Sequence, residues 1–247
     1  MKTIGLLGGM SWQSTSSYYQ AINQAVNDKL GGLHSAKILI NSVDFAEIEK
    51  RQRLGLWDEM ANMLTAEAKS LQLAGADCLL ICTNTMHKVA TQIEAQINIP
   101  LLHIVDATAA QLLADDISKV GLLGTRFTMQ ETFYKTRLTN QFAIDVIVPE
   151  QDEQIIIDNI IFDELCLGVI SDISRKLYLQ FIDKLFAQGA QAVILGCTEI
   201  ALLVTPSDTQ VPLYDTTEIH ANSAVNYALH SAPHSAHHYT LNSAQKG

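Results

Sequence analysis

The sequence predicts an α/β protein of two similar lobes, each with a central, mainly parallel sheet flanked by helices. Short β-branched runs alternate with segments of helical periodicity, and three landmarks recur in the same order along the chain. Hydrophobic residues make up 48% of the 247 residues, enough to bury a sizeable core. We expect a pseudo-two-fold axis between the lobes and a ligand site in the cleft between them.

Eight short apolar runs are the expected strands. Strands that alternate with helices form βαβ units, and the carboxyl ends of their parallel strands meet at one edge of the sheet. Glycine-rich loops follow several of these runs, so each lobe should offer one wall of the cleft. The runs are residues 3–7, 36–43, 78–82, 101–105, 119–124, 143–148, 192–196 and 211–214.

Two segments have the clearest helical period. Residues 171–188 lie between Ser171, a favourable N-cap, and Gly189, a common terminator, and residues 58–74 likewise end at a glycine. Both should pack an apolar stripe on a sheet. The stripes are Ile173, Leu177, Phe181 and Leu185, with Tyr178, Ile182 and Phe186 beside them, in the first segment, and Met60, Leu64, Leu71 and Ala74 in the second.

The internal repeat is the basis for the lobe boundaries. Its offset drifts by only a few residues across three landmarks, which indicates a duplicated unit with small loop changes. We expect a first lobe of residues 1–103 with 212–230, a second lobe of residues 104–211, and a loosely held tail at 231–247. Val120 lies 116 residues after Ile4, Gly189 lies 114 after Gly75, and Pro212 lies 112 after Pro100.

Charge and composition favour a small-molecule site. The formal charge of -10 argues against binding to nucleic acid or to an anionic membrane. The N-terminal segment does not resemble a secretory signal and no apolar run could span a bilayer, so we expect a cytoplasmic protein. The four cysteines should be reduced thiols there, and the spacing of Cys78 and Cys82, without a second pair, predicts no metal site.

The repeat also decides which residue of "CTNT" corresponds to Cys197. Aligning Gly75 with Gly189 carries Thr83 onto Cys197, whereas Cys82 falls on a glycine. A shift of one residue at the end of a strand turns a side chain to the other face. Thr83, not Cys82, is therefore the expected partner of Cys197 across the cleft.

The motifs "GLLGGMSWQST", "CTNT", "LLGT" and "GCTEI", in this order, resemble the cofactor-independent aspartate/glutamate racemase family over roughly residues 1 to 229. Members carry Cys-Asn-Thr in the first lobe and Gly-Cys-Thr-Glu in the second. Here Thr83 stands in place of the first cysteine, as in the subgroup specific for L-aspartate and L-glutamate. The resemblance implies an amino-acid racemase that needs no cofactor, and a homodimer.

The chemistry that the resemblance implies is a 1,1-proton transfer between opposite faces of the α-carbon. A thiol can be tuned to a thiolate by helix N-terminal amides, but an alkyl hydroxyl is too weak an acid to become a resting base. Cys197 should therefore abstract the α-proton and Thr83 should reprotonate the opposite face. This asymmetry should favour one enantiomer as substrate, and the resemblance implies the L form.

The matched loops supply the expected substrate contacts. Asn84, Thr85 and Thr198 offer donors for the α-carboxylate, and Glu199 can accept from the ammonium group. The glycine-rich loops add Met10 and Thr125. Gln52, with Arg126, is the expected partner of the substrate's side-chain carboxylate.

Several alternatives remain open at this stage. The scaffold also suits hydantoin racemisation or maleate isomerisation, or an amino-acid-binding module without turnover. Thr85, Thr125 and Thr198 could be helix caps, and Cys78, Cys82 and Cys166 are interpreted as packing residues. His87 is interpreted as a solvated helix residue near the mouth, with a proton relay as its alternative.

Overall fold

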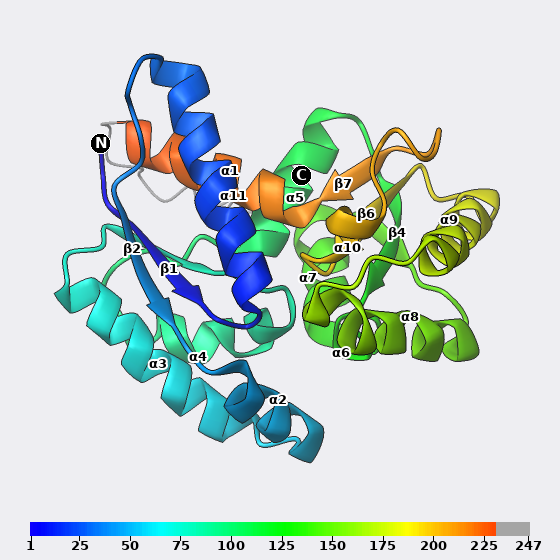
Figure 1. Ribbon diagram of the computed structural model, residues 1–247, viewed down its shortest axis with the longest axis horizontal. Helices are drawn as coiled ribbons and strands as arrows, with labels where there is room; N and C mark the ends of the chain where they lie inside the picture. Colours follow the sequence, from blue (N-terminus) through cyan, green and yellow to red (C-terminus); the bar gives the residue numbers. More distant parts are fainter. Residues whose placement is uncertain (231–247) are drawn as a thin grey trace, which may run out of the picture.

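The computed structural model describes residues 1–230 and forms two parallel sheets. Figure 1 shows them side by side, with the blue and cyan part of the chain around one sheet and the green and yellow part around the other. The expected tail at 231–247 lies outside the described residues. No helix within residues 1–230 has the length and apolar character that a bilayer crossing requires.

The first sheet has three parallel strands in the order β2-β1-β3. They are β1 (Ile4–Gly8), β2 (Ile38–Ser42) and β3 (Cys78–Ile81). The helices of this part of the chain are α1 (Trp12–Leu30), α2 (Phe45–Leu54), α3 (Trp57–Leu73), the short 3-10 helix η1 (Thr85–Val89) and α4 (Ala90–Glu94).

The second sheet has four parallel strands in the order β5-β4-β6-β7. They are β4 (Lys119–Gly124), β5 (Asp145–Ile147), β6 (Ala192–Gly196) and β7 (Leu213–Asp215). The helices around them are α5 (Ile104–Ala114), α6 (Arg126–Gln130), α7 (Thr132–Phe142), α8 (Gln151–Asp163), η2 (Leu165–Leu167), α9 (Asp172–Ala187), α10 (Ile200–Leu203) and α11 (Thr216–Leu229).

The two sheets share a strand order, which supports the internal repeat. In each, the first strand is central, with the second and third on either side. Leu101 makes a single bridge to Leu79, at the place where β7 pairs with β6 in the other sheet. The expected strand at 101–105 is wrong beyond this bridge, because His103 caps α5, which begins at Ile104. The pseudo-two-fold relation stays a prediction.

The segment after residue 212 contacts both halves of the molecule, that is, the part around the first sheet and the part around the second. β7 pairs with β6, so it does not belong to the first sheet, as a lobe boundary at 212 would require. α11 then packs against both α1 and α5, and Figure 1 shows it running from β7 back toward the first sheet. The rest of the division into lobes stays a prediction.

The strands β1, β3, β4 and β6 are buried on both faces, as in parallel sheets covered by helices on both sides. Along β3, Cys78 and Leu80 pack with α1 and α11, and Cys82 continues this face. Leu79 and Ile81 pack on the opposite face with α3 and α4. The strict alternation places Cys82 in a helix-covered core.

The two helices expected from periodicity are present, but some residues of the expected apolar stripes are exposed. Ser171 caps α9 by accepting from the Ser174 N–H at 3.4 Å, and the chain reverses at Gly189. Ile173 and Phe186 of the expected stripe, near the two ends of α9, are exposed. In α3 the buried positions include Met60, Leu64 and Leu71, whereas Ala74 is exposed. The buried hydrophobic residues of α9 are Tyr178, Phe181, Ile182 and Leu185.

Candidate active site

The carboxyl ends of the central strands carry the loops that form the site. The loop after β1 turns at Gly9, whose φ of 89° suits glycine. A Cβ at this position would lie 2.2 Å from the Val43 carbonyl oxygen, so only glycine allows the two loops to approach this closely. The turn delivers Met10 and Ser11 to the cleft.

One small cavity brings together nine of the ten residues expected at the site, all but Arg126. Its free volume is about 20 Å³, room for about one water molecule, so an amino acid must widen it to enter. Apolar residues complete the wall, among them Phe45 and Phe162. The nine are Met10, Gln52, Thr83, Asn84, Thr85, Thr125, Cys197, Thr198 and Glu199.

The buried carboxylate of Glu199 is the centre of the polar network in this cavity. Its Oε2 accepts from the Cys197 thiol at 3.0 Å and from the Thr198 hydroxyl at 2.7 Å. Its Oε1 accepts from the Ser11 hydroxyl at 2.5 Å, with the Cys166 thiol at 3.9 Å. Glu199 therefore already has donors from both halves of the molecule and contacts the Cys197 thiol directly.

This environment disfavours a resting thiolate at Cys197. Burial raises the pKa of the Cys197 thiol well above its ordinary value, and the negative charge of Glu199 raises that pKa further. The backbone N–H of Glu199, at the start of α10, does lower this pKa, as expected of helix N-terminal amides, but burial and the Glu199 carboxylate outweigh it. The thiol needs a proton acceptor, and Glu199 is in hydrogen-bond contact with it.

Thr83 lines the cavity and its neighbour Cys82 does not. Cys82 is fully buried in the core formed with α1 and α11, and burial raises the pKa of its thiol. The Thr83 side chain therefore lies at the cavity and the Cys82 side chain in the core, as the register of the repeat predicts. Their catalytic roles stay predictions.

Two amide side chains in the cavity have unused hydrogen-bonding capacity. Gln52 is 5% exposed, and its Oε1 has no partner within the described residues. Asn84 donates from Nδ2 to the Thr216 hydroxyl at 3.0 Å, while its Oδ1 is also unpartnered there. Buried amide groups of this kind normally find a partner, so both are candidates for substrate contacts.

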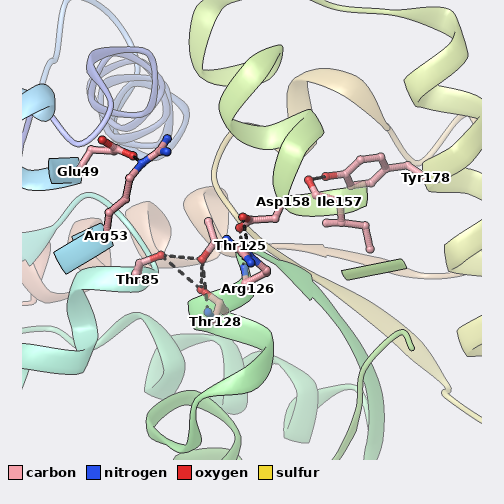
Figure 2. Close-up of polar contacts among 9 residues, drawn as sticks. All are labelled: Glu49, Arg53, Thr85, Thr125, Arg126, Thr128, Ile157, Asp158 and Tyr178. Atoms are coloured by element: carbon pink, nitrogen blue, oxygen red, sulfur yellow. Dashed lines mark hydrogen bonds and ion pairs between the residues drawn. The ribbon is translucent and has the colours of Figure 1, made fainter. Parts of the chain in front are cut away.

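Threonine hydroxyls link the two halves across the cavity (Figure 2). The Thr85 and Thr125 hydroxyls lie 3.0 Å apart, and Thr128 contacts both at 3.4 and 3.2 Å. Thr125 also caps α6, accepting from the Thr128 N–H at 3.3 Å. Thr125 is thus a helix cap, the alternative that the sequence left open, and it also lines the cavity.

No lysine, arginine or histidine lines this cavity in the described part of the chain. Arg126, expected near the substrate's side-chain carboxylate, instead pairs with Asp158, its Nε lying 2.9 Å from Oδ2, and is half exposed. Figure 2 shows Arg53 on the opposite side of the threonine group, paired with Glu49. Among residues 1–230, no three His, Cys, Asp or Glu side chains are arranged so that they could hold a metal ion.

His87 corrects another expectation, because it is buried and not solvated. Its Nδ1 lies 2.8 Å from the Thr83 carbonyl oxygen, and its Nε2 lies 3.2 Å from the Ile104 nitrogen. Both ring nitrogens are engaged and the ring does not line the cavity. A proton relay through His87 to the cavity is not supported by this geometry.

A group of side chains beside the cavity holds the two halves together. Lys88 forms an ion pair with Glu131 at 2.5 Å, and its ammonium lies 3.7 Å from the centre of the Trp57 ring. Trp57 in turn meets Phe127 edge to face, with ring centres 5.4 Å apart. These contacts, with the Ser11 to Glu199 hydrogen bond, describe a closed cleft.

Sequence reasoning missed two residues of the polar network. Ser11 follows Met10 in the same loop, and its hydroxyl accepts from the Ser14 N–H as the N-cap of α1. Cys166 was interpreted as packing but lines the cavity near Glu199. Ser11 directly follows the glycine-rich loop that ends at Met10, and this position could have indicated it. No local feature of the sequence distinguished Cys166.

The comparisons with known proteins agree on the fold and the family. A family model described as Asp/Glu/Hydantoin racemase matches residues 7–224. The chain is 24% identical over 241 residues to the broad specificity amino-acid racemase RacX of Bacillus subtilis, covering 92% of this chain and 98% of that protein.

Two solved structures extend the comparison. A candidate Asp/Glu racemase from Yersinia pestis is 55% identical, with a TM-score of 0.86 over 93% of this chain and 100% of that one. An aspartate racemase homologue from Pyrococcus horikoshii is 31% identical, with a TM-score of 0.81 over 92% and 99%.

Proposed function

The chain belongs to the Asp/Glu/Hydantoin racemase family and is an isomerase of the amino-acid racemase type, and on this premise we propose that it inverts L-amino acids by a 1,1-proton transfer without a cofactor. Cys197 removes the α-proton and Thr83 protonates the opposite face. The observation that carries this proposal is the contact of Glu199 with the Cys197 thiol in a cavity that Thr83 also lines.

The first step removes the α-proton. The Cys197 S–H gives its proton to Glu199 Oε2, 3.0 Å away, and this transfer creates the thiolate at the moment it is needed. The α-C–H bond then breaks, an S–H bond forms at Cys197, and the electron pair remains on the substrate as a carbanion conjugated with its carboxylate. The hydroxyl of Thr85 and the backbone N–H groups of Thr85 and Thr198 are placed to stabilise that charge, whereas the Thr198 hydroxyl is held by Glu199.

The second step completes the inversion. The Thr83 O–H bond breaks as its proton forms the new C–H bond on the opposite face. Thr83 is left as an alkoxide, a strong base that regains a proton through water. Since Glu199 still holds the proton from the thiol, its return to Thr83 restores every group and leaves the proton count unchanged. The Thr83 half of the cycle is the energetically harder one.

The asymmetry of the two groups predicts unequal behaviour of the enantiomers. Because L- and D-amino acids have equal free energies, kcat/KM must be the same in both directions. The difference should therefore appear in kcat, since a D-substrate bound to the resting enzyme faces a protonated hydroxyl. We expect a larger saturated initial rate from the L-enantiomer, matched by a larger KM. Equal saturated rates from L- and D-substrate would contradict the roles of Cys197 and Thr83.

The resemblance implies L-aspartate, L-glutamate or both as substrates, and the cavity favours a second candidate class. Its lining contains a carboxylate, neutral hydroxyls, thiols and amides, but no cation within residues 1–230. Burial of a substrate's side-chain carboxylate without a cationic partner is costly. Gln52, with an unpartnered amide oxygen, better suits an uncharged polar side chain.

Matched substrate pairs separate these two classes. L-Asparagine and L-glutamine have nearly the same shape as L-aspartate and L-glutamate but no side-chain charge. We expect the exchange of the α-proton for solvent deuterium to have a larger kcat/KM with L-asparagine and L-glutamine than with the matching acids. A preference for the acids would instead support the aspartate/glutamate assignment. Absence of exchange with any amino acid would contradict the racemase proposal itself.

The cytoplasmic location and the homodimer stay predictions of the sequence and of the resemblance. The residues proposed to act in the catalytic cycle belong to one chain and line one cavity. We therefore expect the catalytic cycle proposed here to need only the residues of one subunit. A measurement of specific activity against protein concentration checks this expectation.

A further inference from the structure

The chain crosses between the two sheets at residues 102–105, after the bridge at Leu101 and at the start of α5. Three histidines each bond a different backbone group of this crossing segment. His220 Nε2 lies 2.7 Å from the Leu102 carbonyl oxygen, His87 Nε2 lies 3.2 Å from the Ile104 nitrogen, and His103 Nδ1 accepts from the Val105 N–H at 3.2 Å. The crossing segment is thus held by side chains from η1, α5 and α11.

The partners of His87 decide where its proton lies. A carbonyl oxygen can only accept, so Nδ1 carries the hydrogen and donates to Thr83. Nε2 then has the lone pair that accepts from the Ile104 N–H. Burial, and then the neighbouring rings of His103 and His220, keep the pKa of His87 well below its ordinary value. The ring is neutral, and its tautomer is defined by two backbone groups.

The position of Thr83 depends on this ring. The hydrogen bonds that the described residues give Thr83 are made by its backbone: its N–H donates to the Ile81 carbonyl oxygen at 2.9 Å, and its carbonyl accepts from His87 at 2.8 Å. The first bond ties Thr83 to its own strand, and the second ties it, through His87, to the crossing segment. Movement of that segment is therefore passed to Thr83.

We propose that His87 is a positioning residue, which couples the placement of the Thr83 hydroxyl to the segment on which the two halves of the molecule pivot. The cavity admits an amino acid only after it widens, so the halves must move relative to one another in each cycle. Through His87, Thr83 reaches its place over the α-carbon as the crossing segment returns to its closed position. His87 does not touch the cavity and acts only through Thr83.

This inference rests on the proposed function, and two substitutions separate the two bonds of the ring. In His87→Asn the amide nitrogen is as many bonds from Cα as Nδ1, so the variant can still donate to the Thr83 carbonyl. In His87→Gln the amide oxygen is as many bonds from Cα as Nε2, so it can still accept from the Ile104 N–H. Each variant keeps one hydrogen bond and loses the other, so together they test both links of the coupling.

Because the coupling needs both bonds, we expect His87→Gln and His87→Asn each to lower the saturated racemisation rate by about 10²-fold, the cost of a misplaced reacting group. In both variants the solvent deuterium isotope effect should also rise, because protonation by Thr83 becomes slower relative to abstraction by Cys197. A purely structural role would reduce the amount of active protein and leave the isotope effect unchanged. A loss confined to one of the two variants, or an unchanged isotope effect, would overturn the inference.

A measurement on the unsubstituted chain tests the same idea if a variant fails to fold. Nitrogen-15 NMR of the His87 ring should show a neutral Nδ1–H tautomer between pH 6 and about 9. An Nε2–H tautomer or an imidazolium would overturn the inference, since neither gives the pair of bonds that the positioning requires. Failure of the proposed function is distinct from these outcomes, because it appears as absence of racemisation in the parent chain.

Discussion

Replacement of Cys197 by serine should reduce racemisation and α-proton exchange by at least about 10³-fold, within the range expected for loss of a positioned base. The serine hydroxyl keeps the size and approximate position of the thiol, and Glu199 can still accept its hydrogen bond. Its pKa, however, lies far above that of a thiol, so transfer of its proton to Glu199 is much less favourable. The measurement is solvent deuterium incorporation at the α-carbon of the best substrate found among the matched pairs.

The matched control for this substitution is Cys82→Ala. Cys82 lies one residue before Thr83, yet it packs against α1 and α11 and does not line the cavity. The variant should lose some stability from the small void and keep most of its exchange activity. If Cys82→Ala abolished exchange and Cys197→Ser retained it, the assignment of catalytic faces from the repeat would be wrong.

The arrangement of the site was predictable where it followed from periodicity. In each parallel sheet the carboxyl ends of the strands lie at the same edge, so the loops of the site meet there. The internal repeat then pairs Thr83 with Cys197. Alternation along β3 explains why Cys82, although it stands in the motif, faces the helices. These inferences need only the spacing of residues along the chain.

Other features depend on tertiary contacts that spacing does not contain. The pKa of Cys197 is governed by burial and by Glu199, not by the short helix that follows it. From the sequence alone Arg126 could bind a substrate carboxylate. In the structure Asp158, 32 residues later, accepts hydrogen bonds from both the backbone and the side chain of Arg126. The sequence offered no sign that Asp158 would be there.

The crossing segment is a third case of this kind. The run "LLHIV" has the composition of a strand, but only Leu101 pairs. His103 ends the run by capping α5, and His220 reaches the Leu102 carbonyl from more than a hundred residues away. The same contacts bury His87, which the sequence placed in solvent.

Replacement of Glu199 by glutamine tests whether the carboxylate receives the thiol proton. Two effects oppose each other in this variant. Removal of the negative charge withdraws one cause of the raised pKa of Cys197, which favours the thiolate, but it also removes the proton acceptor. Burial is the larger cause of the raised pKa and remains, so the loss of the acceptor should prevail. We expect a rate about 10²-fold below the parent near neutral pH.

The pH dependence of Glu199→Gln distinguishes a lost base from a damaged site. Without the carboxylate, activity depends on direct ionisation of a thiol whose pKa lies above its ordinary value. Below that pKa the thiolate fraction rises about tenfold per pH unit, so the variant should recover activity from pH 7 toward pH 9. In the parent the proton only moves within the Cys197 and Glu199 pair, and kcat should change little over this range.

Glu164→Gln is the matched control for this profile. Glu164 accepts from the Ser174 hydroxyl at 2.6 Å near the same end of the second sheet, but it does not line the cavity. Its loss should leave the rate within a few-fold of the parent and the pH profile unchanged. A Glu199→Gln variant that kept the parent's rate, or that lost activity equally at pH 7 and pH 9, would show that Glu199 serves to orient the thiol and Ser11 and does not accept the proton.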